Sequence, residues 1–430
     1  MGQRWWRHPG ASRVLRTGHG ACPRRVRMPI VLSSAARPAI AGAFATQGFV
    51  FISLTTRLPD FSDRWHLSEI ELSGLLLMMV LLAGVGSVLA EQLVKRSGSA
   101  TLLRSGLALL ALGVPVLALA PAVGVFVAGM ALYGVGLGVV DATSNMQAVA
   151  LEHRLGRPIL PSFHGAWTAG GVVGAALTLL TPNFPLQGAA VLALVPVLAL
   201  LPVAGAFVQR DHGETLHADA VVVPWRPILL VGAALVIFYM VDTAAATWGP
   251  TYLDTTFSTP SGLVALATFP YLVASGVVRL AGDGLVARWG AVLVLRVGAL
   301  LASAALAVVV FAPTWEVAVV GFTLLGVGVA VIAPLSFSAA ARIAGAAGDG
   351  LADGGDTPGA RQARVDAVIA RFNQFNYVGA LLGAVLTGVV GAGNLRIGFA
   401  VPMVLVLLIL PLARAFATGR QTWTSSTPTS

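Results

Sequence analysis

Cysteine, lysine and charge are all scarce in this sequence of 430 residues. It has one cysteine (Cys22), one lysine (Lys95) among its 27 basic residues, and a charged fraction of only 10%. A lone cysteine cannot form an intramolecular disulfide, and no cysteine–histidine spacing typical of a metal site is present, so a disulfide scaffold is excluded and no metal or cofactor is expected. The low charge excludes a disordered chain and an ordinary soluble enzyme, because soluble domains are about one-quarter charged.

Apolar residues make up most of the chain instead, with 57% hydrophobic residues and a mean hydropathy of +0.84. A membrane-spanning helix needs about 20 apolar residues, so a chain of this length holds about twelve with short loops. The composition therefore predicts an all-α integral membrane protein. The predicted spans are residues 36–57, 70–92, 101–120, 123–149, 161–181, 187–208, 227–250, 261–284, 290–312, 315–341, 367–391 and 397–417.

Basic residues are distributed unevenly among the predicted loops. If the N-terminus is cytoplasmic, only Arg57, Arg64 and Arg396 face outward. Both termini are therefore expected on the cytoplasmic side of the cell membrane. The net charge of +9 is explained by this topology, so no nucleic-acid partner is expected. Residues 1–27 hold seven arginines and no apolar run, which is not the pattern of a signal peptide, and translation could begin at Met1 or at Met28.

The two halves of the sequence repeat each other at a constant spacing. The matched pairs include Glu91/Asp283, Arg96/Arg288, Arg104/Arg296, Gly134/Gly326 and Pro121/Pro313. The repeat predicts two six-helix halves in the same orientation, a layout typical of transporters. The predicted division is a basic, disordered segment at 1–35, a first half at 36–208, a central cytoplasmic loop at 209–226, a second half at 227–417 and a tail at 418–430.

Several motifs resemble those of the major facilitator superfamily over about residues 36–417. The loops Glu91–Gly98 and Asp283–Gly290 keep the arginine and final glycine of that family's G-x-x-x-D-R-x-G-R-R motif, but Lys95 and Ala287 replace its aspartate. Two further motifs are similar to those of a bacterial branch near the fucose permeases. They are Asp141-x-x-x-Asn145-x-Gln147 and, after it, Phe163-His164-Gly165-x-Trp167. The resemblance implies two six-helix pseudo-repeats around a central cavity and transport of a sugar-like solute. The altered loop motif argues against a typical drug exporter or sugar porter of the kind that has the intact motif.

Two titratable side chains are candidates for coupling transport to protons. Asp242 lies inside the seventh predicted span, where an ionised carboxylate is costly and protonation removes most of the cost. The alternative for Asp242 is a structural hydrogen bond to a facing helix. His164 opens the fifth predicted span and could sense proton loading, because imidazole titrates near neutral pH, or act as a gate residue.

Polar and aromatic side chains within the predicted spans are candidates for contacting the solute. Amides and hydroxyls beside aromatic rings suit a ligand with apolar ring faces and hydrogen-bonding groups. Helix packing, or interfacial anchoring in the case of Trp167, is the alternative for several of them. The predicted solute-binding residues are Gln47, Asn145, Trp167, Tyr239, Trp248, Asn373 and Asn376.

Charged residues near the cytoplasmic ends of spans are candidates for a gate. Arg279 and Asp283, four residues apart on one helix, could pair, and Glu91 could pair with Arg96 or with a residue of the other half. Asp141 could brace the fourth span or bind solute hydroxyls. The predicted gate residues are Asp141, Glu91, Arg96, Arg279, Asp283 and Arg288.

The sequence therefore predicts a monomeric secondary transporter that moves a small polar solute by alternating access, with a proton as the coupling ion. An exporter of an organic compound on the same fold is the first alternative. A non-transporting membrane sensor is an alternative of another class, although no predicted loop is long enough for an effector domain. A membrane-embedded enzyme is a further alternative, but no ATP-binding motif or catalytic triad is present.

Overall fold

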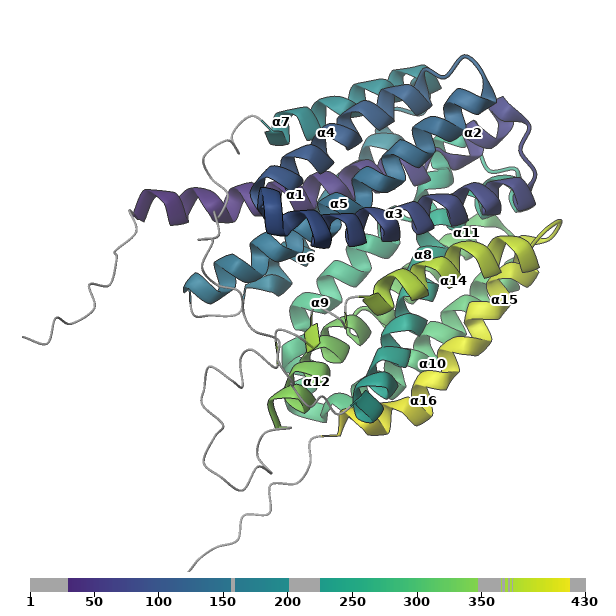
Figure 1. The fold of residues 1–430 in the computed structure, drawn as a ribbon. Helices are drawn as coiled ribbons and strands as arrows, with labels where there is room; N and C mark the ends of the chain where they lie inside the picture. Colours follow the sequence, from purple (N-terminus) through teal and green to yellow (C-terminus); the bar gives the residue numbers. More distant parts are fainter. Residues whose placement is uncertain are drawn as a thin grey trace, which may run out of the picture.

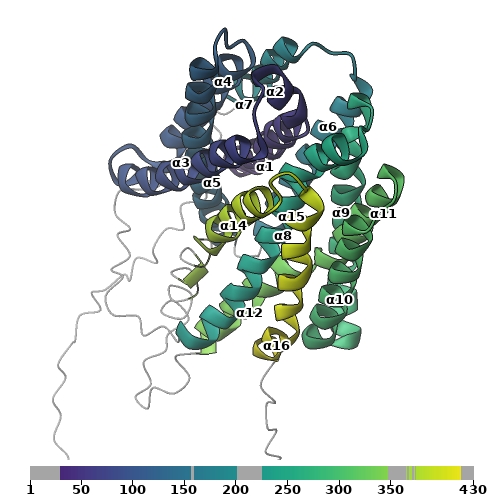
Figure 2. The ribbon, with the colours of Figure 1, turned by 90° about the vertical axis from the view of Figure 1, so that its right-hand side faces the viewer.

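The computed structural model describes residues 30–155, 159–200, 225–346 and 374–417, together with 365, 368, 369 and 372. Most of the predicted N-terminal segment, central loop and C-terminal tail lies outside these residues. All described elements are helices, and they form two halves that lie side by side (Figures 1 and 2).

The first half contains six apolar spans and one short helix between the first two. Its elements are α1 (Ile30–Thr55), α2 (Leu58–Trp65), α3 (Glu69–Ser97), α4 (Ser99–Ala118), α5 (Val123–Leu155), α6 (Leu160–Leu180), and η1 (Leu186–Ala193) continued by α7 (Leu194–Leu200). A capping box begins α3, because the Ser68 side chain accepts from the Glu71 amide and the Glu71 carboxylate accepts from the Ser68 amide. We call the end of the bundle that carries α2 the α2 end.

The second half repeats this order without a counterpart of α2. Its elements are α8 (Trp225–Phe257), η3 (Ser261–Ala267) continued by α9 (Phe269–Trp289), α10 (Ala291–Val310), α11 (Trp315–Val329), α12 (Ile332–Ala346), α14 (Gln374–Val390), and α15 (Leu395–Leu405) continued by η4 (Val406–Leu408), α16 (Ile409–Leu412) and η5 (Ala413–Phe416).

The number of apolar helices confirms the predicted fold class. Ten helices of the described chain are long and apolar enough to cross a membrane, and Leu186–Leu200 and Gln374–Val390 are shorter apolar helices that border residues outside the description. The predicted boundary at Pro121 is confirmed, since α4 ends at Ala118 and α5 begins at Val123. The tenth predicted span, 315–341, is instead broken between α11 and α12.

The predicted repeat is confirmed in the backbone at matching positions. Gly98 and Gly290 separate α3 from α4 and α9 from α10, and both adopt a positive φ, 74° and 77°, that favours glycine. The close helix contacts repeat as well. A Cβ on Gly134 would lie 2.8 Å from the Met79 carbonyl oxygen, and a Cβ on Gly326 would lie 2.3 Å from that of Tyr271. Both the glycines and their contact partners have the spacing of the sequence repeat.

The first helices of the two halves can be aligned by a contact of the same kind. A Cβ on Gly174 of α6 would meet the Phe49 carbonyl oxygen at 2.6 Å, and a Cβ on Gly383 of α14 would meet that of Met240 at 2.3 Å. These contacts align α1 with α8 and α6 with α14 independently of side-chain identity. The alignment allows residue-by-residue comparison of the two halves.

Two of the three arginines predicted to face outward, Arg64 and Arg396, share a structural role at the α2 end. Arg64 donates to the carbonyl oxygens of Ala118 and Ala120, where α4 ends, at 3.1 and 2.8 Å. Arg396 donates to those of Val310 and Ala312, at the matching end of α10, at 2.8 and 2.7 Å. Carbonyls at a helix C-terminus lack intrahelical donors, so both arginines satisfy groups that would otherwise be unpaired.

A candidate transport site between the two halves

Asp242 lies at the middle of α8, a helix of 33 residues most of which are buried. Its Oδ1 atom accepts a very short hydrogen bond from the hydroxyl of Tyr271, which is fully buried on α9. The tyrosine therefore supplies the facing-helix partner that a carboxylate inside a membrane requires. Sequence reasoning missed Tyr271, although its spacing of eight residues from Arg279 places both on one face of α9.

Arg279 links α9 to two other helices of the bundle. Pro334 has no backbone N–H, so the carbonyl of Ala330, four residues earlier, loses its helical donor and the span breaks there. Arg279 Nε donates to this carbonyl at 3.2 Å, and its Nη1 donates to the Thr168 hydroxyl at 3.1 Å. The guanidinium also interacts electrostatically with Asp242. Arg279 thus joins the break in the tenth span, the first half and the acid on α8.

Asp141 is the acidic centre of a second cluster, on α5. Its Oδ2 atom accepts from the Tyr377 hydroxyl on α14, at 2.5 Å, so the contact crosses between the halves. Asn145 Nδ2 donates to the Asp141 carbonyl at 2.9 Å and lies 3.4 Å from its carboxylate. The Gln47 side chain also hydrogen bonds to the carboxylate. Tyr377 further bonds the Ser87 side chain of α3.

Tyr239 connects the two acidic clusters. This half-buried tyrosine of α8 interacts electrostatically with Asp242, Asp141 and Arg279. The two clusters are therefore parts of one arrangement at the interface of the halves. We call it the central polar network, and it consists of Gln47, Asp141, Asn145, Thr168, Tyr239, Asp242, Tyr271, Arg279 and Tyr377.

The contacts of this network across the two halves are related by the repeat. Arg279 of α9 bonds Thr168 of α6, and Ser87 of α3 bonds Tyr377 of α14. Ser87 and Arg279 occupy equivalent positions of α3 and α9, and Thr168 and Tyr377 occupy equivalent positions of α6 and α14. Equivalent positions therefore hold the halves together on both sides of the interface.

His164 lies at the edge of the network among aromatic rings. Its ring is 5.4 Å from that of Phe44 and 6.5 Å from that of Phe337, which belongs to the other half. It also interacts electrostatically with Arg279. The geometry places His164 at a contact between the halves, close to the cationic end of the network.

The remaining predicted solute-binding residues fall into different environments. Trp248 is fully buried, and its Nε1 donates to the Ala384 carbonyl at 2.8 Å, so its polar atom is engaged in packing α8 against α14. Trp167 is half-buried, and its ring lies 6.2 Å from that of Phe51. Asn376 is half-buried beside Tyr377, whereas Asn373 lies outside the described residues.

The remaining predicted gate residues lie near the end opposite α2. The Glu91 carboxylate accepts from Gln374 Nε2 of the other half at 3.4 Å. Arg96 is exposed, and exposed Arg288 lies over the ring of the neighbouring Trp289, 5.6 Å from its centre. The side chain of Asp283 lies outside the described residues, and the hydrogen bonds of Arg279 are to Ala330 and Thr168.

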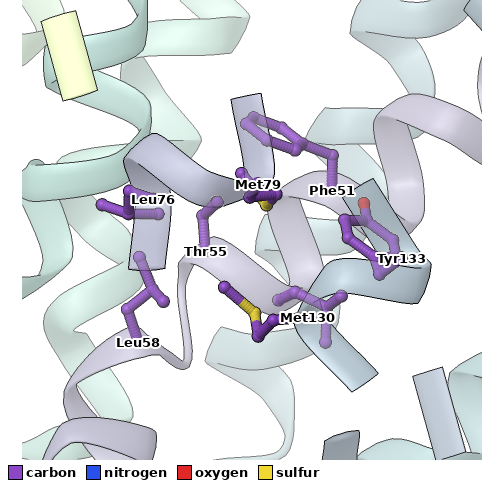
Figure 3. Close-up of a pocket in the computed structure, with 8 residues that line it drawn as sticks. Phe51, Thr55, Leu58, Leu76, Met79, Met130 and Tyr133 are labelled. Atoms are coloured by element: carbon purple, nitrogen blue, oxygen red, sulfur yellow. The ribbon is translucent and has the colours of Figure 1, made fainter. Parts of the chain in front are cut away.

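One small pocket lies within the first half, apart from the central polar network (Figure 3). Its lining comes from α1, α2, α3 and α5 and consists of Phe51, Leu54, Thr55, Leu58, Leu76, Met79, Met130 and Tyr133. Its lining is largely apolar, so it offers few groups to orient a polar solute. No cluster of three His, Cys, Asp or Glu side chains within the described part of the chain could hold a metal ion.

Comparison with known proteins identifies the family. The model of the Major Facilitator Superfamily matches residues 6–157. An uncharacterized MFS-type transporter of Yersinia pestis is 26% identical over 383 residues, which cover 87% of this chain and 94% of that protein. These findings support a transporter of the Major Facilitator Superfamily, whose members are transporters and not enzymes.

Two further comparisons agree with this assignment. An uncharacterized transporter of Sinorhizobium fredii is 28% identical over 309 residues, 70% of this chain and 81% of the relative. The crystal structure of the Escherichia coli fucose:proton symporter, 17% identical, superposes with a TM-score of 0.58 and covers 90% of this chain and 99% of that one. At this identity the similarity shows the fold alone. The predicted two-half fold is thereby confirmed.

Proposed function

We propose that this transporter moves a small polar solute together with a proton, by alternating access of the central polar network to the two sides of the cell membrane. Asp242 is the group that takes up and releases the proton. The observation that carries the proposal is the position of Asp242 at the middle of α8, hydrogen bonded to one hydroxyl and near one cation.

The surroundings of Asp242 suit both of its charge states. Tyr271 can donate to the ionised carboxylate and can accept from the protonated acid, because a hydroxyl has both functions. Arg279 lies near enough to compensate the negative charge electrostatically while bonding neutral groups. A group that tolerates both states inside a membrane is suited to carry a proton.

The solute is proposed to bind between Asp141 and Asp242, beside Tyr239. The Asp141–Tyr377 and Arg279–Thr168 contacts cross the interface, so a solute there touches both halves and can respond to their relative movement. The solved structure with the same fold is named a fucose:proton symporter, which supports a sugar-like cargo moving with a proton. His164 and Glu91 are proposed as gate residues at the cross-half contacts they make.

Proton movement in proteoliposomes tests this proposal. A pH-sensitive dye reports internal acidification when sugars, sugar acids and nucleosides are added outside, for the wild type and for Asp242→Asn. We expect solute-dependent acidification in the wild type and none in the variant, because the amide cannot release a proton. Equal acidification by both proteins would remove Asp242 from the proton pathway.

A matched variant separates loss of coupling from loss of folding. Asp254 lies on the same helix but twelve residues away, at the α2 end, so Asp254→Asn removes one carboxylate from α8 without touching the network. We expect it to behave as the wild type. Internal acidification by external solute indicates symport and internal alkalinisation indicates antiport, which under an inward proton gradient correspond to import and export.

A further inference from the structure

We propose that Arg279 binds the carboxylate of an anionic cargo, so that the solute is a small hydroxylated organic acid that moves together with the proton of Asp242. This inference rests on the proposed function, because it assumes that Asp242 carries the proton. It goes beyond that function by naming the charge of the solute and the residue that recognises it.

Arg279 has hydrogen-bonding capacity that its contacts leave unused. A guanidinium has five N–H donors in a planar fork and stays charged at any physiological pH. Nε and Nη1 donate to the Ala330 carbonyl and the Thr168 hydroxyl, and both of these acceptors are neutral. Within the residues that the structure describes, Nη2 makes no hydrogen bond. The free edge of the fork matches a carboxylate, which accepts two parallel N–H bonds.

The charge of Arg279 needs compensation in every state of the site. A cation inside the membrane needs a nearby anion, and Asp242 provides one while it is ionised. When Asp242 takes up a proton, Arg279 loses that compensation, and a cargo carboxylate restores it. The empty site with ionised Asp242 and the loaded site with protonated Asp242 plus an anion then have the same net charge.

This equality provides a physical reason for coupling. A proton without the anion leaves the site more positive by one charge, and the anion without the proton leaves it more negative by one. Both partly loaded states are disfavoured when the halves close around the site, since a low-dielectric interior penalises net charge. Only the empty and the fully loaded states cross readily, so proton and anion move together.

The other ionisable groups near the pair do not change this balance. Asp141 is held by Tyr377, Asn145 and Gln47 rather than by Arg279. In this proposal Asp141 stays protonated in the empty and loaded states, so that both have no net charge; an ionised Asp141 would instead make the proton-only site neutral. Tyr239 and Tyr271 remain neutral hydroxyls. His164 interacts with Arg279 but lies among aromatic rings at the edge of the site, and it also contributes equally to both states.

Two buried polar groups suit hydroxyl groups on the cargo. Gln47 Oε1, on a side chain only 5% exposed, and the hydroxyl of Ser275, which is 1% exposed, have no hydrogen-bond partner among the described residues. Ser275 lies between Tyr271 and Arg279 at four-residue spacing on the same face of α9. Buried polar atoms left unpaired are costly, and hydroxyls on the cargo would satisfy them.

Binding of matched carboxylates and amides to the purified full-length protein tests the inference. The pairs are lactate and lactamide, glycerate and glyceramide, and gluconate and gluconamide, each titrated by its effect on thermal unfolding. We expect at least one carboxylate to bind more tightly than its amide. Arg279→Gln should weaken that binding about tenfold to a hundredfold, as expected for loss of a charge-assisted hydrogen bond, and Arg279→Lys should recover part of it.

Two variants serve as controls. Arg226→Gln removes an exposed arginine at the start of α8 and should leave binding unchanged. Asp242→Asn mimics the protonated acid, so it should bind the carboxylate with little dependence on pH, while binding to the wild type weakens as the pH rises. The same variant should no longer acidify proteoliposomes.

The outcomes distinguish this inference from the proposed function. If no carboxylate binds more tightly than its amide, or if Arg279→Gln binds the carboxylate as tightly as the wild type, the anionic cargo is ruled out, whereas proton coupling through Asp242 still stands. If Asp242→Asn moves protons as the wild type does, the proposed function fails, whatever the charge of the cargo.

Discussion

At equivalent positions of their first helices, the second half has a carboxylate and the first half has a phenyl ring. In the alignment of α1 with α8, Asp242 corresponds to Phe51, and in the alignment of α3 with α9, Tyr271 corresponds to Met79. Asp242 and Tyr271 share a buried hydrogen bond, whereas Phe51 and Met79 line the largely apolar pocket of Figure 3. One backbone frame therefore carries a polar pair in the second half and an apolar pocket in the first.

The repeat preserves the contacts between helices, while the side chains at equivalent positions differ in chemistry. Asp141 corresponds to Ala333, and Ser87 corresponds to Arg279, so each half supplies groups that the other lacks. The second half holds the acid and the cation proposed to exchange charge. The first half holds Asp141, which is anchored across the interface by Tyr377. A proton bound in one half can then affect how that half meets the other.

Removal of the Tyr271 hydroxyl should give the largest effect in this comparison. Tyr271→Phe deletes the donor to Asp242, and hydrogen bonds to charged groups are worth about 1.5–3 kcal/mol. We expect solute-dependent proton flux in proteoliposomes to fall about tenfold to a hundredfold. Met79→Leu, the matched change in the first half, conserves volume and should leave the flux unchanged. Equal losses in both variants would show that packing, not the hydroxyl, is responsible.

A methyl group added at the tight helix contact of either half should destabilise the protein, but only the change in the second half should alter transport. A Cβ at position 326 would lie 2.3 Å from the Tyr271 carbonyl oxygen, and one at position 134 would lie 2.8 Å from that of Met79. We expect Gly326→Ala and Gly134→Ala each to lower stability by about 1–3 kcal/mol, as overpacking does. Only Gly326→Ala displaces the partner of Asp242, so only it should reduce proton flux per folded molecule.

The control for this pair is Gly84→Ala, because no atom lies within 4 Å of a Cβ there. Alanine favours the helix over glycine by about 1 kcal/mol, so this variant should be at least as stable as the wild type. Thermal unfolding in detergent measures all three variants. Unchanged stability of Gly326→Ala would contradict the close approach of α9 and α11.

Much of the fold could be predicted from the sequence because membrane spans depend on local composition. Apolar runs of about 20 residues, charged loops and the internal repeat indicate the number and order of helices. The break at Ala330 was missed, although Pro334 signals it, because the apolar run continues through both residues. Helix α2 was missed because Leu58–Trp65 is short and polar, which is typical of a loop.

The site was harder to predict, because partners on different helices leave no mark in sequence spacing. Asp242 and Asp141 were found as isolated acids in apolar surroundings, but Tyr271 and Tyr377 were not assigned to them. For Arg279 the sequence offered Asp283, four residues along its own helix, as a possible partner, since only neighbours at such spacing can be inferred from one sequence. Its bonds to Ala330 and Thr168 require the tertiary structure.

Trp248 tests whether an aromatic residue predicted to touch the solute has a packing role instead. Its equivalent in the first half is Arg57, and each donates an N–H across to the fifth or eleventh span, Arg57 to Thr178 and Trp248 to Ala384. Trp248→Phe should cost about 0.5–1.5 kcal/mol, the worth of one neutral hydrogen bond, and leave solute affinity unchanged. A loss of solute affinity with unchanged stability would show instead that Trp248 contacts the cargo.

The smallest effect is expected at Asp60 of α2, the helix that has no counterpart in the second half. Asp60 lies beyond the membrane-spanning segments, and burial raises its pKa, opposed by Arg57 and assisted by Asp63. The folded protein therefore binds this proton more tightly than the unfolded chain, so the stabilisation is present at acid pH. It is lost as the pH rises from the unfolded value of about 3.9 through the raised folded value. Asp60→Thr, which removes the carboxylate, should slightly raise the unfolding temperature at neutral pH and flatten its dependence on acid pH. A lower unfolding temperature at neutral pH would mean that the attraction of Asp60 to Arg57 outweighs the cost of burying its charge.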